Sequence, residues 1–254
     1  MAPTQQILGI RFFVGSAIDA VEQMSHTGGV MVVPAAPAMV KLRYDKVYRD
    51  AMVGADLAIP DSGLMVLLWK IIRRENLTRI SGLAYLKRLI SEPAFRESGR
   101  SFFVLPTEPA KARLLDWASS EGLRIEAEDC YVAPLYPAVV EDRGLLSKIA
   151  NRRLANIVIA IGNGAQEKLG IFLRDHLSYR PAIHCIGAAL GFLTGDQVAI
   201  PDWADRFYLG WLLRLFAQPR IFIPRLGRAL ELPWLMLKFG ENLPTLKPMA
   251  KEGG

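Results

Sequence analysis

The sequence is poor in cysteine and lacks long apolar runs. Its 254 residues include two cysteines, Cys130 and Cys185, which lie in apolar surroundings and share no paired spacing. A disulfide framework or a zinc site is therefore not expected, and a reducing compartment is the simpler interpretation. No apolar segment approaches the roughly 20 uncharged residues that a membrane-spanning helix needs. Residues 1–6 show no basic stretch followed by an apolar run, so we expect no signal peptide and a protein that is soluble or lies on a membrane.

Several catalytic motifs are also missing. The sequence contains no Asp-x-Asp, no P-loop and no Gly-x-Gly-x-x-Gly. Ser62 stands in Asp-Ser-Gly rather than in a Gly-x-Ser-x-Gly elbow, which makes nucleophilic hydrolysis a weak interpretation. Glu126, Glu128 and Asp129 alternate near a predicted strand end, but an exposed acidic edge explains them better than a metal site. No metal or cofactor is expected, because no metal-ligand spacing unites the three histidines, His26, His176 and His184.

The composition indicates a globular chain with an anionic partner. With 51% hydrophobic and 22% charged residues, the chain can bury the core of one large domain or of one domain with an appendage. Its net charge of +6 and its pI near 9.4 favour nucleotides, phospholipid surfaces or nucleic acid as partners. Charge alone does not choose among them.

Short apolar runs alternate with longer periodic segments along most of the chain. This alternation predicts an α/β fold with a Rossmann-like, mostly parallel sheet that has helices on both faces. The predicted strands cover residues 7–14, 30–33, 57–59, 102–105, 124–127, 157–161 and 183–186. The predicted helices begin at Ser16 (with a capping box), Pro37 (ending at Gly54), Leu64, Gly82, Glu108 and Gln166. From Trp203 onward only helical patterns remain, so we predict an α/β domain over residues 1–195 and a basic helical appendage over residues 196–254.

A glycine-rich turn marks the first candidate binding site. The buried strand predicted at residues 157–161 runs into Gly162-Asn163-Gly164, and a helical pattern follows from Gln166. Backbone N–H groups at the start of such a helix are unpaired and the helix dipole is positive there, so a phosphate or carboxylate is favoured. Gln166 and Glu167 add polar groups for a sugar or base. The alternative is an ordinary strand-to-helix turn whose glycines serve packing, and spacing alone does not decide between them.

Asp61 is the carboxylate that stands out. It follows the apolar run 57–59 and precedes Ser62-Gly63 at a predicted helix start, which places it at the carboxyl edge of the sheet, where α/β proteins bind ligands. A carboxylate there can act as a general base if a substrate hydroxyl lies within about 3 Å. The alternative role is a helix N-cap, for which Asp is among the best residues, and the two roles compete for the same oxygens.

The C-terminal run of residues 203–228 is rich in tryptophan and arginine. In it, Trp203 and Trp211 alternate with Arg206 and Arg214. Such a run suits an interface between apolar and anionic material, as at a lipid headgroup layer, although a helix packed on the domain with solvated arginines explains it equally well. Arginines can also bind a diphosphate bidentately. Single-stranded nucleic acid fits less well, because Phe and Tyr platforms on strands are absent.

Taken in order, these segments resemble the WecG/TagA/CpsF glycosyltransferases, which move a sugar from a UDP-sugar to a polyprenyl-diphosphate-linked acceptor in bacterial cell-surface polymer synthesis. The resemblance runs from about Ile7 to about Leu230. It rests on Ala55 to Gly63, Arg79 to Gly82, Gly162 to Lys168, Gly187 to Gly195, and Trp211 to Arg225. Each match is weak alone, but their shared order makes coincidence a poor explanation.

The resemblance implies a specific mechanism. Asp61 matches the proposed catalytic base, which removes a proton from the acceptor hydroxyl so that this hydroxyl attacks the anomeric carbon with inversion. Arginines and helix N–H groups can stabilise the departing UDP without a metal. The appendage would close the site near the membrane. The implied substrate-binding residues are Gly162, Asn163, Gln166, Glu167, Gly187, Arg79, Arg214, Arg220 and Arg225.

The sequence also departs from the family pattern. Pro34-Ala35-Ala36 stands where the family usually has Thr-Pro-Asn, and Gly164-Ala165 stands in place of Pro-Lys. We expect an inverting, metal-independent transferase of an N-acetylhexosamine-type sugar, cytoplasmic and peripheral on the inner face of the cell membrane. Exposed apolar helices would also be compatible with a homo-oligomer. A noncatalytic relative that binds a nucleotide or partner proteins is the alternative, and a third interpretation, RNA binding by the basic tail, predicts steep salt dependence.

Overall fold

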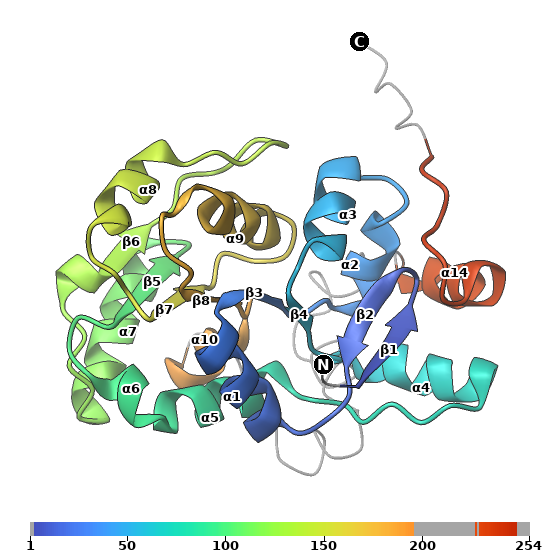
Figure 1. Ribbon diagram of the computed structural model, residues 1–254, viewed down its shortest axis with the longest axis horizontal. Helices are drawn as coiled ribbons and strands as arrows, with labels where there is room; N and C mark the ends of the chain where they lie inside the picture. Colours follow the sequence, from blue (N-terminus) through green and yellow to red (C-terminus); the bar gives the residue numbers. More distant parts are fainter. Residues whose placement is uncertain (1–2, 196–226, 228, 248–254) are drawn as a thin grey trace.

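One mixed sheet forms the centre of the molecule (Figure 1). The structure, a computed structural model, describes residues 3–195, 227 and 229–247. Among these residues, eight strands pair in the order β1-β2-β4-β3-β8-β7-β5-β6, and every neighbouring pair is parallel except β1 and β2. The strands are Thr4–Ile7 (β1), Ile10–Phe13 (β2), Gly29–Val32 (β3), Leu57–Ala58 (β4), Ser101–Leu105 (β5), Cys130–Val132 (β6), Asn156–Ile159 (β7) and Ala182–Cys185 (β8). The predicted Rossmann-like α/β fold is confirmed.

Helices cover both faces of the sheet and define two hydrophobic cores. One core includes residues of Ala36–Lys41 (α2), Lys46–Val53 (α3), Gly63–Arg73 (α4), Arg143–Ala150 (α8), Ala165–His176 (α9) and Glu231–Phe239 (α14). The other includes residues of Ala17–Thr27 (α1), Gly82–Ser91 (α5), Pro93–Arg96 (α6), Glu108–Ser120 (α7) and Ala189–Leu193 (α10). The central strands β3, β7 and β8 are buried along their whole length, which fits their mostly apolar sequences; the two polar side chains in them, Asn156 and His184, lie within hydrogen-bond distance of each other.

The predicted strand over residues 7–14 is wrong in its extent. The structure has a hairpin there, in which β1 and β2 pair antiparallel around Leu8 and Gly9. Both turn residues have positive φ, 49° and 80° respectively, which reverses the chain within two residues. A Cβ on Gly9 would lie 2.2 Å from Leu243 Cγ, so no larger residue fits this turn.

The helix predicted from Pro37 to Gly54 is also wrong, because it is two helices. The first, α2, ends at Lys41, and α3 begins at Lys46. The Asp45 carboxylate accepts a hydrogen bond from the Tyr48 N–H at 2.9 Å and caps α3. The cap at Asp45 therefore divides residues 37–54 into two helices, although their apolar periodicity continues across the division.

The strand predicted at residues 124–127 lies too early in the chain. A 3-10 helix occupies Ala127–Asp129, and the strand that follows it and pairs with β5 is β6, which begins three residues after the predicted end. The acidic residues belong to this turn, where Asp129 accepts a hydrogen bond from the Glu126 N–H and pairs with Arg152. The predicted helix starts at Ser16, Gly82, Glu108 and Gln166 agree with the structure within one residue, and Ser16 forms the expected capping box with Asp19.

The described end of the chain packs on its beginning. Helix α14 contacts α2 and α4, and the Glu231 carboxylate accepts hydrogen bonds from Arg43 and Tyr44. Beyond α14, the backbone N–H groups of Leu8 and Gly9 donate to the carbonyl oxygens of residues 240 and 241. The boundary predicted between residues 195 and 196, and most of the predicted appendage, lie outside the described residues.

Candidate functional site

The loops at the carboxyl edge of the sheet form the candidate site. Strands β3 and β8 are parallel neighbours, yet the helices that follow them, α2 and α10, pack in different cores on opposite faces. Such a change of direction is where open α/β sheets bind ligands. The loops after β4 and β7 lie one strand further out on either side and carry Asp61 and the turn Gly162-Asn163-Gly164.

Asp61 does not cap the helix that follows it. The N-cap of α4 is Ser62, whose hydroxyl accepts a hydrogen bond from the Met65 N–H at 3.3 Å. The N-cap interpretation of Asp61 is therefore wrong for this helix. Instead, Asp61 Oδ1 accepts the Gly82 N–H at 2.8 Å, at the first residue of α5. The positive end of α5 thus faces the carboxylate, while 32% of the Asp61 side chain remains exposed.

Arg79 fixes the same loop. Its Nε donates to the Asp61 carbonyl oxygen at 2.5 Å, and its Nη2 lies 3.6 Å from Asp61 Oδ1. Gly82 is also a packing point: a Cβ there would lie 3.2 Å from Val33 Cγ1 and 3.7 Å from the Ala189 Cβ. The ends of β3, β4 and β8 therefore converge on the start of α5.

The glycine turn is held by the first residues of α9. Gly162 and Gly164 have φ of 96° and 106°, a conformation that side-chain-bearing residues rarely adopt. The Gly164 N–H donates to Glu167 Oε2 at 2.6 Å. Glu167 is fully buried, and burial raises the pKa of its carboxyl, against the opposing effect of this hydrogen bond.

Gln166 connects this turn to the loop after β8. Its Oε1 accepts the Gly187 N–H at 3.0 Å, and its Nε2 donates to Asn163 Oδ1 at 3.1 Å. Gln166 is also fully buried. The structure thus brings together four of the predicted substrate-binding residues: Asn163, Gln166, Glu167 and Gly187. Gln166 and Glu167 hydrogen-bond to each other and to backbone groups around them.

Sequence reasoning missed Lys41. This last residue of α2 donates from Nζ to the Asn163 carbonyl oxygen at 3.3 Å and brings a positive charge to the glycine turn. No motif marks it, because it approaches the turn only through the packing of α2. The predicted site residues Arg214, Arg220 and Arg225 lie outside the described residues, as does most of the tryptophan- and arginine-rich run.

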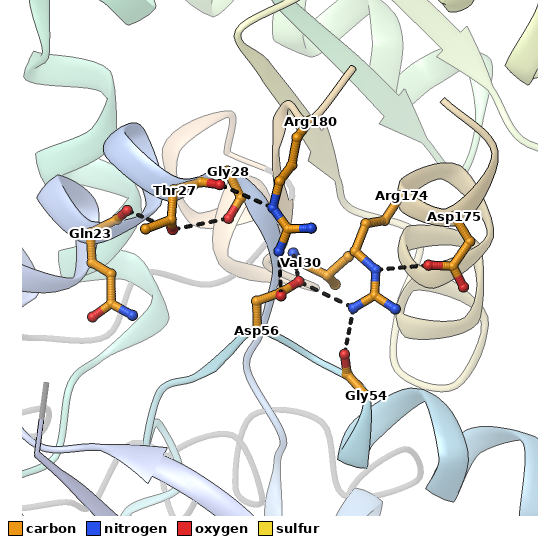
Figure 2. Close-up of polar contacts among 9 residues, drawn as sticks. All are labelled: Gln23, Thr27, Gly28, Val30, Gly54, Asp56, Arg174, Asp175 and Arg180. Atoms are coloured by element: carbon orange, nitrogen blue, oxygen red, sulfur yellow. Dashed lines mark hydrogen bonds and ion pairs between the residues drawn. The ribbon is translucent and has the colours of Figure 1, made fainter. Parts of the chain in front are cut away.

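The other aspartate of the 55–63 segment, Asp56, precedes β4 and so lies at the opposite, amino edge of the sheet. Figure 2 shows its contacts. Asp56 Oδ2 accepts the Val30 N–H at 2.8 Å, and its carboxylate pairs with Arg174 at 3.2 Å and with Arg180 at 2.5 Å. Arg180 also donates to the Thr27 carbonyl oxygen, at 3.0 Å. Asp56 therefore ties β3 and β4 to the end of α9 and does not approach the candidate site.

The remaining titratable candidates are structural. His184 is fully buried, its Nδ1 lies 2.9 Å from the Tyr85 hydroxyl, and its Nε2 lies 3.2 Å from Asn156 Oδ1. Burial lowers the pKa of His184 to about 3. Cys130 and Cys185 are buried free thiols. In the described part of the chain, no group of three or more His, Cys, Asp or Glu side chains is placed to hold a metal ion.

These features define an open-sheet α/β protein that carries a carboxylate, a glycine turn and two basic side chains at the carboxyl edge of its sheet. A sequence profile of the Glycosyl transferase WecG/TagA/CpsF family matches residues 5–247, so the chain belongs to this glycosyltransferase family. The chain is also 26% identical over 211 residues to N-acetylglucosaminyldiphosphoundecaprenol N-acetyl-beta-D-mannosaminyltransferase from Bacillus spizizenii, across 81% of this chain and 76% of that relative. Within the described residues, no helix is both long and apolar enough to cross a membrane.

Proposed function

We propose that the protein is an inverting glycosyltransferase that moves an N-acetylhexosamine-type sugar from UDP to a polyprenyl-diphosphate-linked acceptor in cell-surface polysaccharide synthesis. Family membership supports the transferase class. The Bacillus relative is named for the transfer of N-acetyl-mannosamine to N-acetylglucosaminyl-diphosphoundecaprenol, which supports the choice of sugar and acceptor.

The position of Asp61 is the observation that carries this proposal. Its carboxylate is oriented by the Gly82 N–H and remains partly exposed at the carboxyl edge of the sheet. In the proposed step, Asp61 takes the proton of the acceptor hydroxyl while the hydroxyl oxygen attacks the anomeric carbon. The bond from that carbon to the UDP oxygen breaks on the opposite side, and its electron pair leaves with UDP.

The glycine turn would receive the leaving group. The N-terminal end of α9 favours an anion there, and Asn163 and Gly187 border it. We propose that the buried side chains of Gln166 and Glu167 shape this cradle, and that Arg79, Arg214, Arg220 and Arg225 contribute positive charge.

We further propose that the protein meets its lipid-linked acceptor at the inner face of the cell membrane through its C-terminal region. In that region α14 exposes 42% of Trp234 and 69% of Leu237. Arg43 and Lys238 lie 4.8 and 4.9 Å from the Trp234 ring centroid, so cations flank an exposed indole, an arrangement that suits a headgroup layer. A second copy of the chain is the other occupant that would suit these apolar groups.

A transfer assay tests the proposal. UDP-N-acetylhexosamines would be incubated with a short-chain polyprenyl-diphosphate-linked N-acetylglucosamine, and the anomeric configuration of the product would be read by NMR. Asp61→Asn should abolish transfer and retain UDP affinity in calorimetric titration, with ADP as the control ligand in metal-free buffer. Asp116→Asn, at an exposed position on α7, serves as the matched control.

A noncatalytic relative predicts a different result from the same assay. The observation in its favour is the start of α2, where the N-cap residue Ala35 makes no side-chain cap hydrogen bond and its neighbours Pro34 and Ala36 are buried. A polar group is thus missing beside the site. UDP binding without turnover on any lipid-linked acceptor would favour this relative, whereas a product of retained configuration would refute the inverting mechanism.

A further inference from the structure

Lys41 places a positive charge directly on the glycine turn. Its Nζ lies 3.3 Å from the Asn163 carbonyl oxygen, and a Cβ on Gly164 would lie 3.2 Å from the same Nζ. The missing side chain at Gly164 therefore leaves room for the ammonium group. Lys41 ends α2 on the β3 side of the site, so its charge reaches the turn from an element other than α9.

Lys41 forms no ion pair with a carboxylate of the described residues, whereas nearby Lys168 does. Lys168, in the first half of α9, has a side chain that is only 7% exposed, and it pairs with Asp45 at 2.7 Å and donates to the Ala138 carbonyl oxygen at 2.9 Å. For Lys41, no carboxylate oxygen of a described residue lies within 4.0 Å of Nζ. Lys41 is also only partly buried, so a ligand at the turn can reach it.

A purely structural role for Lys41 would be to balance the buried charge of Glu167. Lys41 does favour the ionised form of Glu167, but this is the weakest of the effects on that carboxyl. The Gly164 N–H and the Gln166 amide already bond both Glu167 oxygens, at 2.6 and 3.1 Å. Glu167 is therefore held without Lys41.

We propose that Lys41 binds the diphosphate of the nucleotide-sugar donor, a role that rests on the proposed function. Lysine binds phosphate as a compact point charge, and here it would act beside the N-terminal end of α9, whose own first residue, Ala165, has no charge. During transfer the electron pair of the broken sugar–oxygen bond passes to the diphosphate. Lys41 stabilises this added negative charge and transfers no proton.

Calorimetric titration of UDP into wild type, Lys41→Met and Lys41→Arg tests this role. Methionine keeps the length of the side chain and removes its charge, so we expect UDP affinity to fall about 10- to 100-fold, the range for a hydrogen bond to a charged group. Arginine should retain most of the affinity. Lys46→Met is the control, because this exposed lysine of α3 pairs with Asp50 away from the turn.

Thermal unfolding of the same variants separates binding from structure. If Lys41 binds the diphosphate, Lys41→Met keeps the wild-type melting temperature while UDP affinity falls. Unchanged UDP affinity in Lys41→Met overturns the inference, and so does an affinity loss shared by Lys41→Arg and accompanied by a lower melting temperature. If wild type neither binds UDP nor transfers sugar from it, the proposed function itself fails. Transfer by wild type with an unchanged donor KM in Lys41→Met defeats only the role of Lys41.

Discussion

The Asp61 carboxylate accepts the backbone N–H of Gly82, the first residue of α5, at 2.8 Å. This contact joins two segments that lie 21 residues apart in the chain. It gives the carboxylate a fixed orientation without using the start of its own helix, α4, which Ser62 caps. The geometry of α5 thus becomes part of the geometry of the proposed base.

Gly82→Ala should lower kcat while the protein stays folded. The added Cβ would lie 3.2 Å from Val33 Cγ1 and 3.8 Å from Asp61 Oδ1, so we expect the start of α5 and Val33 to move apart by a few tenths of an ångström, which displaces the Gly82 N–H. A small misplacement of a proposed base is expected to lower kcat by about tenfold or more. Gly144→Ala in the first turn of α8 is the control, because its Cβ would make an ordinary 3.5 Å contact. Equal kcat values for the two variants would contradict the prediction.

Gln166→Ala should weaken UDP binding and also lower stability. The substitution leaves the buried Gly187 N–H without its side-chain acceptor and releases Asn163, at a cost of roughly 1–3 kcal/mol in unfolding free energy. Urea denaturation and UDP titration would measure both effects. Gln23→Ala on α1, at the opposite edge of the sheet, should change neither. The prediction is wrong if Gln166→Ala keeps both wild-type values.

Asp56→Ala should destabilise the fold without a specific effect on catalysis. It removes the acceptor of the Val30 N–H and the shared partner of Arg174 and Arg180, so we expect a loss of roughly 1–3 kcal/mol in unfolding free energy. Below its lowered melting temperature, the folded variant should keep the wild-type kcat. Asp50→Ala, which breaks only an exposed pair with Lys46, should cost less than about 1 kcal/mol. A specific loss of kcat in folded Asp56→Ala would contradict this assignment.

His184 should make the protein less stable in acid. Burial lowers its pKa from 6.5 to about 3. Between these pH values His184 is therefore protonated in the unfolded chain and neutral in the folded protein. The free energy by which the neutral, buried His184 stabilises the folded state is fully present above pH 6.5. It is lost as the pH falls toward 3, at up to about 1.4 kcal/mol per pH unit. Urea unfolding at pH 7.5, 6.5 and 5.0 would show this loss in wild type and a smaller one in His184→Gln. NMR should find the His184 ring neutral throughout that range, and a ring that titrates near pH 6.5 would refute the assignment.

Trp234→Ser combined with Leu237→Ser should reduce binding to vesicles that contain anionic phospholipid. Both side chains are exposed on α14, and Lys238 lies beside the Trp234 ring. We expect cosedimentation with the vesicles to fall severalfold, and wild-type binding to weaken as salt rises. Leu67→Ser, at an exposed apolar position on α4, tests whether any surface leucine has the same effect. If vesicle binding is unchanged while the oligomeric state changes, the surface is a subunit interface.

Much of the fold could be predicted because buried parallel strands leave a direct signal. Strands such as β3 and β7 are buried on both faces, so residues 30–32 and 157–159 are all apolar, and Gly29 and Asn156 precede these runs. The hairpin at Leu8 and Gly9 gave no such signal, since the run from residue 7 to residue 14 is mostly apolar across the turn. The space at Gly9 is set by Leu243, far along the chain, and no local pattern encodes that contact.

The candidate site likewise has a part that the sequence predicts and a part that it does not. The placement of Asp61 and the glycine turn after strands followed from local order, and both lie at the carboxyl edge as expected. The partner of Asp61 and the approach of Lys41 depend on how α5 and α2 pack on the sheet. Both are long-range contacts, so they had to be observed.

The contact between the first hairpin and the last described segment sets an order of events during protein synthesis. Gln6 donates to the Glu241 carbonyl oxygen across 235 residues, and Leu243 fills the space beside Gly9. At roughly 5–20 residues per second, a ribosome needs about 10–50 s to make the intervening chain. Throughout that time β1 can pair with β2, which follows it directly in the chain, but the hairpin lacks its contacts with residues 240–243. The hairpin made first by the ribosome therefore completes its packing only after residues 240–243 have been made, so these contacts are among the last of the fold to form.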